Sequence, residues 1–299
     1  MVALGLDIGG SKVEAQIFDS GWNLLANKRV KTPGDRTSML EEISNLILWA
    51  EKTNSIEVIG LAAPGFNLVD KNLLSINLGA NSQQLVVDLE LKINRKIEWI
   101  NDARAFTVSE AILGAGQYYQ AVMGLVLGTG VGAGFVINGS LVSDAHSNAG
   151  EVGHISAPLS VCRELPILDC KCGRTCCYEV YISGSGLSKL VHFYAGKNLQ
   201  PEEINVVKKT EPKIFKAWEK WCHIVAELII TSASHLNTDI VVLGGGLSKM
   251  DDVIEDLTNA VNQRALSSVK QPKIVLAEAG DASGARGAAY AAYLKDRRE

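Results

Sequence analysis

The stretch GLDIGGSKVEAQIFDSG, residues 5–21, and the stretch GLVLGTGVGAGFVINGS, residues 124–140, repeat one pattern. Each starts with Gly-Leu, reaches a turn of small residues rich in glycine, and continues as an apolar strand that ends in a second turn. This pattern predicts a β-hairpin in each copy. Two such hairpins predict two similar sheets that face each other across a cleft. The alternative is a coincidence between two glycine-rich hairpins.

The rest of the chain alternates strands with helices. Helical spacing of apolar residues predicts helices over residues 39–50 and 214–236. KIEWINDARAFTVSEAI predicts a strand that breaks at Asn101–Asp102 and continues as a helix. Further strands are predicted at LLANKRVKT, EVIGLAAPG and IVVLGGGLS, and a closing helix at GDASGARGAAYAAYL. This alternation indicates an α/β protein.

Composition excludes several classes of function. The 299 residues are 47% hydrophobic and 21% charged, as in a soluble globular protein with a substantial core. A net charge of -4 gives no reason to expect nucleic acid or an anionic membrane as a partner. No apolar run approaches the roughly 20 residues of a membrane span, and the N-terminus has no basic leader pattern. We therefore expect a cytoplasmic protein with reduced thiols, in which clustered cysteines indicate a metal.

Three glycine-rich turns indicate phosphate binding. In DIGGSK, residues 7–12, glycines without a Cβ let backbone N–H groups approach phosphate oxygens, and Asp7 could hold Mg²⁺ through water. The alternative there is an ordinary hairpin turn. GTGVGAG, residues 128–134, is a second such loop, and GGGLS, residues 244–248, is a third at a strand end. Three glycine turns without a basic cluster predict a nucleoside triphosphate held by backbone groups and Mg²⁺.

Asp102 is a candidate general base. It follows a strand and precedes a helix, so its carboxylate could point into a cleft and reach a substrate hydroxyl. The alternative is that Asn101 or Asp102 is only the N-cap of the helix, a role worth about 1 kcal/mol. From this stretch alone, the cap is the favoured interpretation.

The run CKCGRTCCYE, residues 170–179, holds four of the six cysteines of the chain. Cys170, Cys172 and Cys177, together with His154 of the upstream GEVGH, offer the Cys₃His ligand set of a structural zinc site. Buried apolar cysteines and a redox pair are the alternatives. Cys176 and Cys162 are further thiols that complicate the assignment.

The motifs DIGGSK, AAPG, NDA, GTGVGAG, GEVGH, CKCGRTCCYE and VVLGGGLS, in this order, resemble the ROK family of bacterial sugar kinases and related repressors. The resemblance runs from Gly5 to about Tyr290. It implies an actin-like, hexokinase-like (ribonuclease H-like) fold in which two α/β domains close over ATP and a hexose, and it implies a homodimer. We expect an N-terminal domain of residues 1–116, completed by residues 284–299, and a C-terminal domain of residues 117–283 with a zinc-binding loop. The family's repressors carry an extra DNA-binding domain before the first glycine loop. In this sequence that loop segment begins at Gly5, so we expect a kinase.

The resemblance also assigns residues to roles. Asp102 would be the catalytic base, which goes beyond the cap interpretation. Zinc would be bound by His154, Cys170, Cys172 and Cys177, and the sugar by Gly65, Asn101, Glu151, His154 and Glu179. ATP would be bound by Gly5, Leu6, Asp7, Ile8, Gly9, Gly10, Ser11, Lys12, Gly128, Thr129, Gly130, Val131, Gly132, Ala133, Gly134 and Phe135, with Gly244, Gly245 and Gly246 near the adenosine.

Two departures from the family pattern stand in the sequence: Ser11 replaces the usual Thr, and Cys176 replaces the usual Gly. The second leaves open whether Cys176 or Cys177 binds the metal. The chain most resembles the N-acetyl-D-glucosamine kinases, which phosphorylate the 6-hydroxyl. Fructose, mannose or glucose kinases, a sugar sensor without activity, and an actin-type ATPase are the alternatives. Residues 75–85 are expected to line the pocket near the sugar's 2-substituent.

Overall fold

The computed structural model describes residues 1–67, 73–74, 84–142, 149–280 and 283–297. The chain forms two compact units. Unit 1 comprises Met1–Gly114, Leu141–Asn148 and Ala279–Glu299, and unit 2 comprises Ala115–Ser140 and Ala149–Glu278. Among the described residues, no helix has the length and apolar character needed to cross a membrane.

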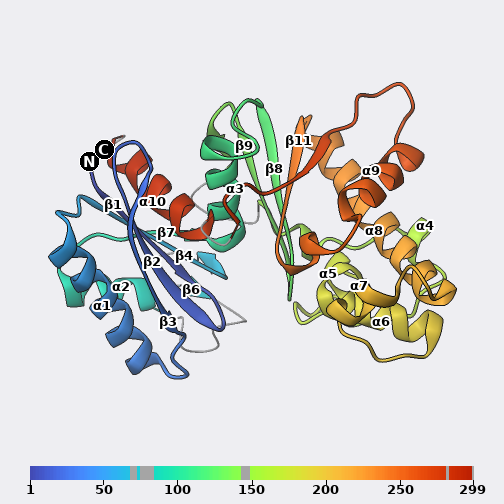
Figure 1. The fold of residues 1–299 in the computed structure, drawn as a ribbon, viewed down its shortest axis with the longest axis horizontal. Coiled ribbons are helices and arrows are strands. Elements are labelled where there is room, and N and C mark those ends of the chain that lie inside the picture. Colours follow the sequence, from blue (N-terminus) through green and yellow to red (C-terminus); the bar gives the residue numbers. More distant parts are fainter. Residues whose placement is uncertain (68–72, 75–83, 143–148, 281–282, 298–299) are drawn as a thin grey trace. The chain divides into compact units, whose positions relative to one another are not determined.

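Unit 1 is built on a five-stranded sheet in the order β3-β2-β1-β4-β7. β1 is antiparallel to β2 and parallel to β4, and β4 is parallel to β7. The side chains of Leu4, Leu6 and Ile8 alternate to one face of β1, where they join a buried core with residues of α1 and α2. Figure 1 shows these two helices beside the sheet of unit 1. The bounds are β1 Ala3–Ile8, β2 Lys12–Phe18, β3 Leu24–Lys31, α1 Arg36–Thr53, β4 Val58–Ala63, β5 Phe66–Asn67, β6 Leu73–Leu74, α2 Leu85–Ile93 and β7 Glu98–Asn101.

The other face of this sheet is covered by α10 (Ser283–Asp296), which also packs on α3 (Asp102–Leu113). α10 contacts the strands directly through glycines. A Cβ at Gly5 would lie 1.9 Å from the carbonyl oxygen of Ala285, and a Cβ at Gly60 would lie 1.9 Å from that of Ala288. Gly5, which opens the first sequence repeat, is therefore needed for packing in this sheet.

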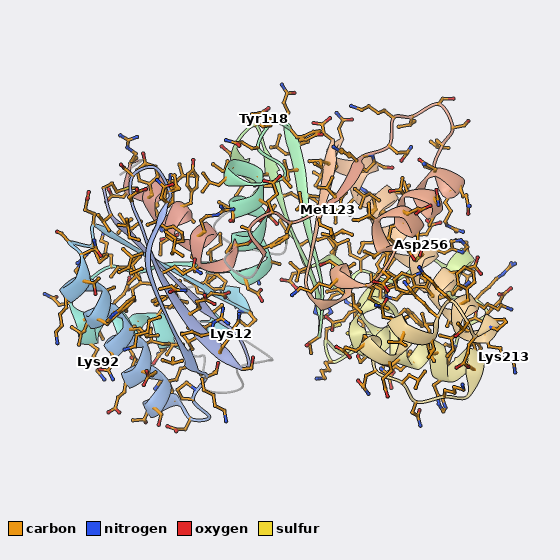
Figure 2. All side chains as sticks on the ribbon, in the orientation of Figure 1. Lys12, Lys92, Tyr118, Met123, Lys213 and Asp256 are labelled. Atoms are coloured by element: carbon orange, nitrogen blue, oxygen red, sulfur yellow. The ribbon has the colours of Figure 1, made fainter. Side chains whose placement is uncertain are left out.

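Unit 2 repeats this sheet, with the order β10-β9-β8-β11-β12. β8 is antiparallel to β9 and parallel to β11, which is parallel to β12. Met123 of β8 is fully buried, whereas Tyr118 before the strand is 91% exposed (Figure 2). The strands are β8 Ala121–Leu127, β9 Val131–Ile137, β10 Ser140–Leu141, β11 Ile240–Gly244 and β12 Lys273–Leu276. The helices are η3 Val152–His154, α4 Leu159–Cys162, α5 Tyr178–Ile182, α6 Gly184–Ala195, α7 Pro201–Val207, α8 Pro212–Leu236, η4 Gly246–Lys249 and α9 Val253–Arg264.

The internal repeat predicted from the sequence is confirmed, because β1–β2 and β8–β9 occupy the same places in two sheets of one topology. The strand and helix at 96–112 are confirmed as β7 and α3, with the break at Asn101–Asp102. The helices predicted over 39–50 and 214–236 are α1 and α8.

Candidate functional site

In unit 1, the candidate residues gather at one edge of the sheet. β1, β4 and β7 are parallel, with Asp7 opposite Ala62 and Ala63 opposite Asn101. Their carboxyl ends therefore bring together the first glycine loop (residues 9–11), Gly65 and the start of α3. This is the edge at which open α/β sheets bind ligands.

Asn101 is the residue that caps α3. Its Oδ1 accepts hydrogen bonds from the N–H groups of Ala103 (3.1 Å) and Arg104 (3.3 Å). Its Nδ2 donates to the carbonyl oxygen of Gly65 at 3.3 Å. Gly65 has a φ of 134°, a conformation that favours glycine. Of the two residues that the sequence left open for the cap, the structure selects Asn101.

Asp102 is the first residue of α3; the residue as a whole is partly exposed, whereas its carboxyl group is largely desolvated by the surrounding protein. Its Oδ1 accepts a hydrogen bond of 2.9 Å from the N–H of Ala103. Burial raises the pKa of Asp102 above its ordinary value, although hydrogen bonds from backbone N–H groups oppose this shift. A carboxyl group at a helix N-terminus with a raised pKa has the properties of a general base.

The first glycine loop presents open backbone. Gly10 is exposed, and a Cβ there would meet no atom within 4 Å. The loop is fixed at its base, where the N–H of Gly9 donates to the carbonyl oxygen of Lys12 (2.9 Å) and the hydroxyl of Thr32 donates to that of Gly9 (2.6 Å). Asp7 lies just before the loop and against α10, because a Cβ at Gly284 would lie 2.4 Å from its Oδ2.

Unit 2 places two further glycine loops next to each other. They follow the parallel strands β8 and β11, in which Val126 lies opposite Gly244. The second glycine loop (residues 128–130) is closed by a hydrogen bond of 3.0 Å from the N–H of Gly128 to the carbonyl oxygen of Gly130. In the third glycine loop (residues 244–246), Gly245 has a φ of 83° and lies so close to β8 that a Cβ would be 2.3 Å from the carbonyl oxygen of Leu127.

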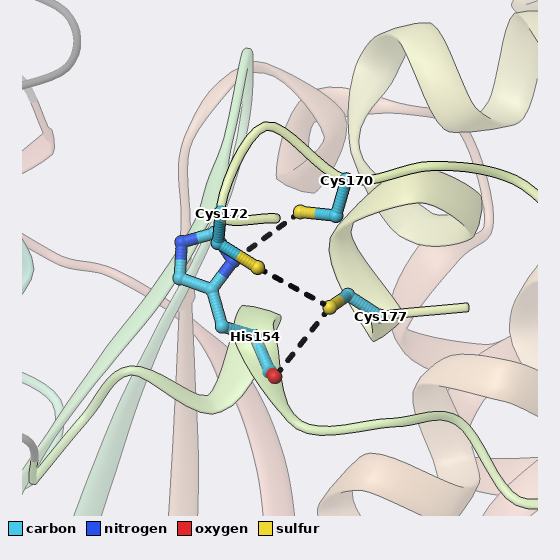
Figure 3. A group of neighbouring side chains, drawn as sticks. All are labelled: His154, Cys170, Cys172 and Cys177. Carbon is cyan, nitrogen blue, oxygen red and sulfur yellow. Dashed lines mark hydrogen bonds between the residues drawn. The ribbon is translucent and has the colours of Figure 1, made fainter. Parts of the chain in front are cut away.

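His154, Cys170, Cys172 and Cys177, the metal-ligand cluster, lie together (Figure 3). Their candidate ligand atoms are all within 4.8 Å of one another. The Sγ of Cys170 is 3.5 Å from Nδ1 of His154, and the Sγ atoms of Cys172 and Cys177 are 3.7 Å apart. A tetrahedral zinc ion with Zn–S bonds of about 2.3 Å and Zn–N bonds of about 2.0–2.1 Å separates its sulfurs by about 3.8 Å and sulfur from nitrogen by about 3.6 Å. The four residues therefore fit zinc.

The structure also separates Cys177 from Cys176. Cys177 is fully buried, and burial raises the pKa of its thiol to about 12. Cys176 lies outside the metal-ligand cluster, and its Sγ accepts a hydrogen bond of 3.3 Å from the hydroxyl of Tyr181. It has a φ of 55°, a left-handed conformation that favours glycine, the residue that the family resemblance leads us to expect here. The thiol of Cys162 donates to the carbonyl oxygen of Pro158 at 3.2 Å.

The candidate sugar ligands of unit 2 include His154 of this cluster and two glutamates that lie within three residues of a cluster member in the chain. Figure 3 shows Nδ1 of His154 facing the sulfurs and the other ring nitrogen pointing away from them. Glu151 precedes η3, and its carbonyl oxygen accepts a hydrogen bond of 3.1 Å from the N–H of His154. Glu179 lies on α5, and its Oε2 accepts a hydrogen bond of 3.0 Å from the N–H of Val131. Of residues 75–85, which were expected to line the sugar pocket, residues 75–83 lie outside the described residues.

The contacts that hold the second glycine loop were not predicted from the sequence. Besides Glu179, the N–H of Gly184 donates to the carbonyl oxygen of Gly128 at 2.8 Å. These partners are about 50 residues from the loop in the chain, and no local pattern links them.

Comparisons with known proteins place the chain among sugar kinases of similar length. A model of the ROK family matches residues 3–295. The N-acetylgalactosamine kinase AgaK of Shewanella sp. (strain ANA-3) is 36% identical over 98% of this chain and 97% of its own. An N-acetyl-D-glucosamine kinase of Vibrio cholerae is 35% identical over 96% of this chain and 98% of its own.

Solved structures agree in fold. The ROK hexokinase of Thermus thermophilus superposes with a TM-score of 0.90 at 26% identity, with full coverage of both chains. A ROK family glucokinase of Streptomyces griseus, solved in complex with glucose and AMPPNP, has a TM-score of 0.80 at 23% identity and covers 98% of this chain with all of its own. The two-unit α/β architecture is therefore that of a sugar kinase fold.

Proposed function

The chain belongs to the ROK family, and we propose that it is an ATP-dependent kinase that phosphorylates the 6-hydroxyl of N-acetyl-D-glucosamine. The observation that carries this proposal is the position of Asp102 at the N-terminus of α3, on the same sheet edge as the first glycine loop. Relatives named as kinases of N-acetylated hexosamines, similar over nearly the whole length, support the choice of substrate class.

Asp102 is proposed as the general base. Its carboxylate accepts the proton of the 6-hydroxyl while that oxygen attacks the γ-phosphorus of ATP. The raised pKa of Asp102 makes its carboxylate a stronger acceptor for the hydroxyl proton than an ordinary aspartate. Asn101 fixes the base, because its side chain joins the first turn of α3 to Gly65. Since the transition state of phosphoryl transfer is loose, positioning and charge neutralisation supply most of the acceleration.

The three glycine loops are proposed to bind ATP. Loops that follow strands at the carboxyl edge of a sheet, with bare Cα atoms, let N–H groups reach phosphate oxygens. The first and second loops are assigned to the phosphates, and the third to the region of the adenosine. Mg²⁺ would neutralise charge on the phosphates, with Asp7 as a partner through water.

The metal-ligand cluster is proposed to hold Zn²⁺ as a structural ion. With Nδ1 of His154 toward the metal, the other ring nitrogen is free of that role and can serve a sugar hydroxyl. Glu151 and Glu179 are proposed as further sugar ligands. The thiols require a reducing compartment, which supports a cytoplasmic location. A homodimer is also part of the proposal, and light scattering of the purified protein at twice the chain mass would support it.

N-acetyl-D-galactosamine is a second candidate substrate. The specific reason is the 36% identity to a kinase of that sugar. The two sugars are epimers at C4, so residues that contact the 4-hydroxyl would decide between them.

A coupled assay of ADP release tests the proposal. The panel contains N-acetyl-D-glucosamine, N-acetyl-D-galactosamine, N-acetyl-D-mannosamine, glucose, mannose and fructose, with a control that lacks sugar. We expect the highest kcat/KM on N-acetyl-D-glucosamine and no ADP without sugar. Greater activity on an unacetylated hexose would overturn the substrate, and ATP hydrolysis without sugar would indicate an actin-type ATPase instead.

A further inference from the structure

The second glycine loop is held at both of its ends by the segment that follows Cys177. At one end, the N–H of Gly184 donates to the carbonyl oxygen of Gly128 at 2.8 Å. At the other end, Oε2 of Glu179 accepts from the N–H of Val131 at 3.0 Å. Gly130 lies against the same carboxylate, since a Cβ there would be 3.0 Å from Oε2 of Glu179. A hydrogen bond to a charged group is stronger than one between neutral groups, so this contact can offset the entropy lost when a few glycines become ordered.

The segment that leads into His154 packs on the strand that leaves this loop. A Cβ at Gly153 would lie 2.3 Å from the carbonyl oxygen of Val131, and a Cβ at Gly150 would lie 2.0 Å from that of Ala133. The N–H of Ala133 also donates to the carbonyl oxygen of Gly150 at 2.8 Å. The backbone of residues 150–153 therefore follows β9 closely.

The metal ligands connect these two segments. His154 ends the segment on β9, and Cys177 begins the segment that carries Glu179. A hydrogen bond of 2.9 Å from the N–H of Tyr178 to the carbonyl oxygen of Ile155 joins them beside the metal-ligand cluster. A metal ion bound by His154 and Cys177 would cross-link the two supports of the second glycine loop.

We propose that this metal cross-link, transmitted by Glu179, orders the second glycine loop for nucleotide phosphates, so that metal and nucleotide bind cooperatively in the absence of sugar. The proposal rests on the proposed function for the identity of the nucleotide. Glu179 acts here as a positioning residue, in addition to the sugar contact assigned to it. Coupling of this kind is reciprocal, so nucleotide must also strengthen metal binding.

The test is calorimetric titration of MgADP into the zinc-loaded protein without sugar. For Glu179→Ala we expect Kd to rise about five- to twenty-fold, because the charged hydrogen bond that orders the loop is lost. Glu179→Gln keeps an acceptor for the N–H of Val131 and should retain most of the affinity. Glu219→Ala, an exposed residue on α8, is the matched control and should bind as the wild type.

Two further titrations test whether Glu179 links the metal and the second glycine loop to MgADP binding. Gly130→Ala should weaken MgADP in the wild type but add little in the Glu179→Ala background, because both changes disturb one contact. Removal of the metal with a chelator should weaken MgADP in the wild type more than in Glu179→Ala, with circular dichroism used to verify that each protein is folded. Faster amide exchange at Val131 in Glu179→Ala would report the loosened loop directly.

The outcomes separate this inference from the proposed kinase activity. Unchanged MgADP affinity in Glu179→Ala would overturn the inference and leave the kinase standing. Tighter MgADP binding in that variant would also overturn it, because the carboxylate would then act by repelling the phosphates. A wild-type protein that binds no MgADP would contradict both proposals.

Discussion

At the scale of single residues, Asn101 and Asp102 have two different roles, the cap of α3 and the proposed general base. The sequence could not assign these roles to one residue or the other. Both types of side chain favour a helix N-terminus. The structure gives the cap to Asn101, through bonds to the N–H groups of Ala103 and Arg104, and places Asp102 one position later. The cap therefore supports the proposed base, and the two interpretations of this stretch are compatible.

Replacement of Asp102 by Asn tests the base. We expect kcat to fall about 10²- to 10⁴-fold, because the amide cannot accept the hydroxyl proton. The affinity for MgADP should be retained. Asp296→Asn, at the exposed end of α10, is the matched control. Turnover near the wild-type rate in Asp102→Asn would show that another group removes the proton.

The raised pKa of Asp102 predicts the acid side of the pH profile. Only the ionised carboxylate can accept a proton, so kcat/KM must decline as pH falls through the folded-state pKa. Burial raises that pKa, so the decline should be centred above the value of about 3.9 typical of aspartate. A profile of kcat/KM against pH that shows the decline at or below that value would contradict a base with a desolvated carboxyl group.

The same shift predicts that Asp102 lowers stability at neutral pH. A carboxyl group with a raised folded-state pKa contributes stability below its unfolded pKa, and this contribution is lost as pH rises through the folded-state pKa. Asp102→Asn should therefore melt at a higher temperature than the wild type at pH 7, and the difference should shrink in acid. Thermal unfolding at both pH values checks the sign, and a lower melting temperature of the variant at pH 7 would refute it.

The sequence predicted the role of single residues best where their side chains have distinctive chemistry. Three cysteines and one histidine indicated a metal set, and the structure brings those four together. Cys177, and not Cys176, lies in the metal-ligand cluster, and the backbone conformation that places the two thiols, with a φ of 55° at Cys176, could not be predicted from the sequence. The hydrogen bond from Val131 to Glu179 depends on tertiary structure and could not be read from spacing.

At the scale of elements, glycines set how closely α10 packs on its sheet. Gly60→Ala would place a Cβ 1.9 Å from the carbonyl oxygen of Ala288, and neither backbone can retreat easily. We expect a loss of about 1–3 kcal/mol, seen as a lower midpoint of thermal unfolding. Gly34→Ala is the matched control, because a Cβ there would meet nothing within 4 Å. Equal midpoints for the two variants would contradict this packing.

Elements were predictable from local patterns because alternation and helical spacing record which face is buried. The alternating apolar residues of β1 and the spacing over α1 give both elements correctly. The packing role of Gly5 was not predicted. The resemblance assigned Gly5 to phosphate binding, whereas the side of Gly5 on which a Cβ would stand is in contact with α10. A glycine beside a ligand and a glycine beside a helix look alike in a sequence.

At the scale of the whole molecule, two sheets of one topology carry different parts of the proposed site. Unit 1 carries Asp102 and the first glycine loop, and unit 2 carries the metal-ligand cluster and the other two loops. The repeat was visible in the sequence because both hairpins keep the same glycine and turn positions. The packing of α10, from the C-terminal end of the chain, onto the N-terminal sheet was not encoded in any short segment.

The proposed reaction transfers the γ-phosphoryl group of ATP to the 6-hydroxyl of an N-acetylhexosamine. Phosphorus and carbon NMR of the product formed from MgATP and N-acetyl-D-glucosamine tests it most directly. We predict one phosphomonoester at C6 for each ADP, and no ADP from the 6-deoxy sugar. Inorganic phosphate as the only phosphorus product besides ADP, or phosphate attached at another carbon, would contradict the account.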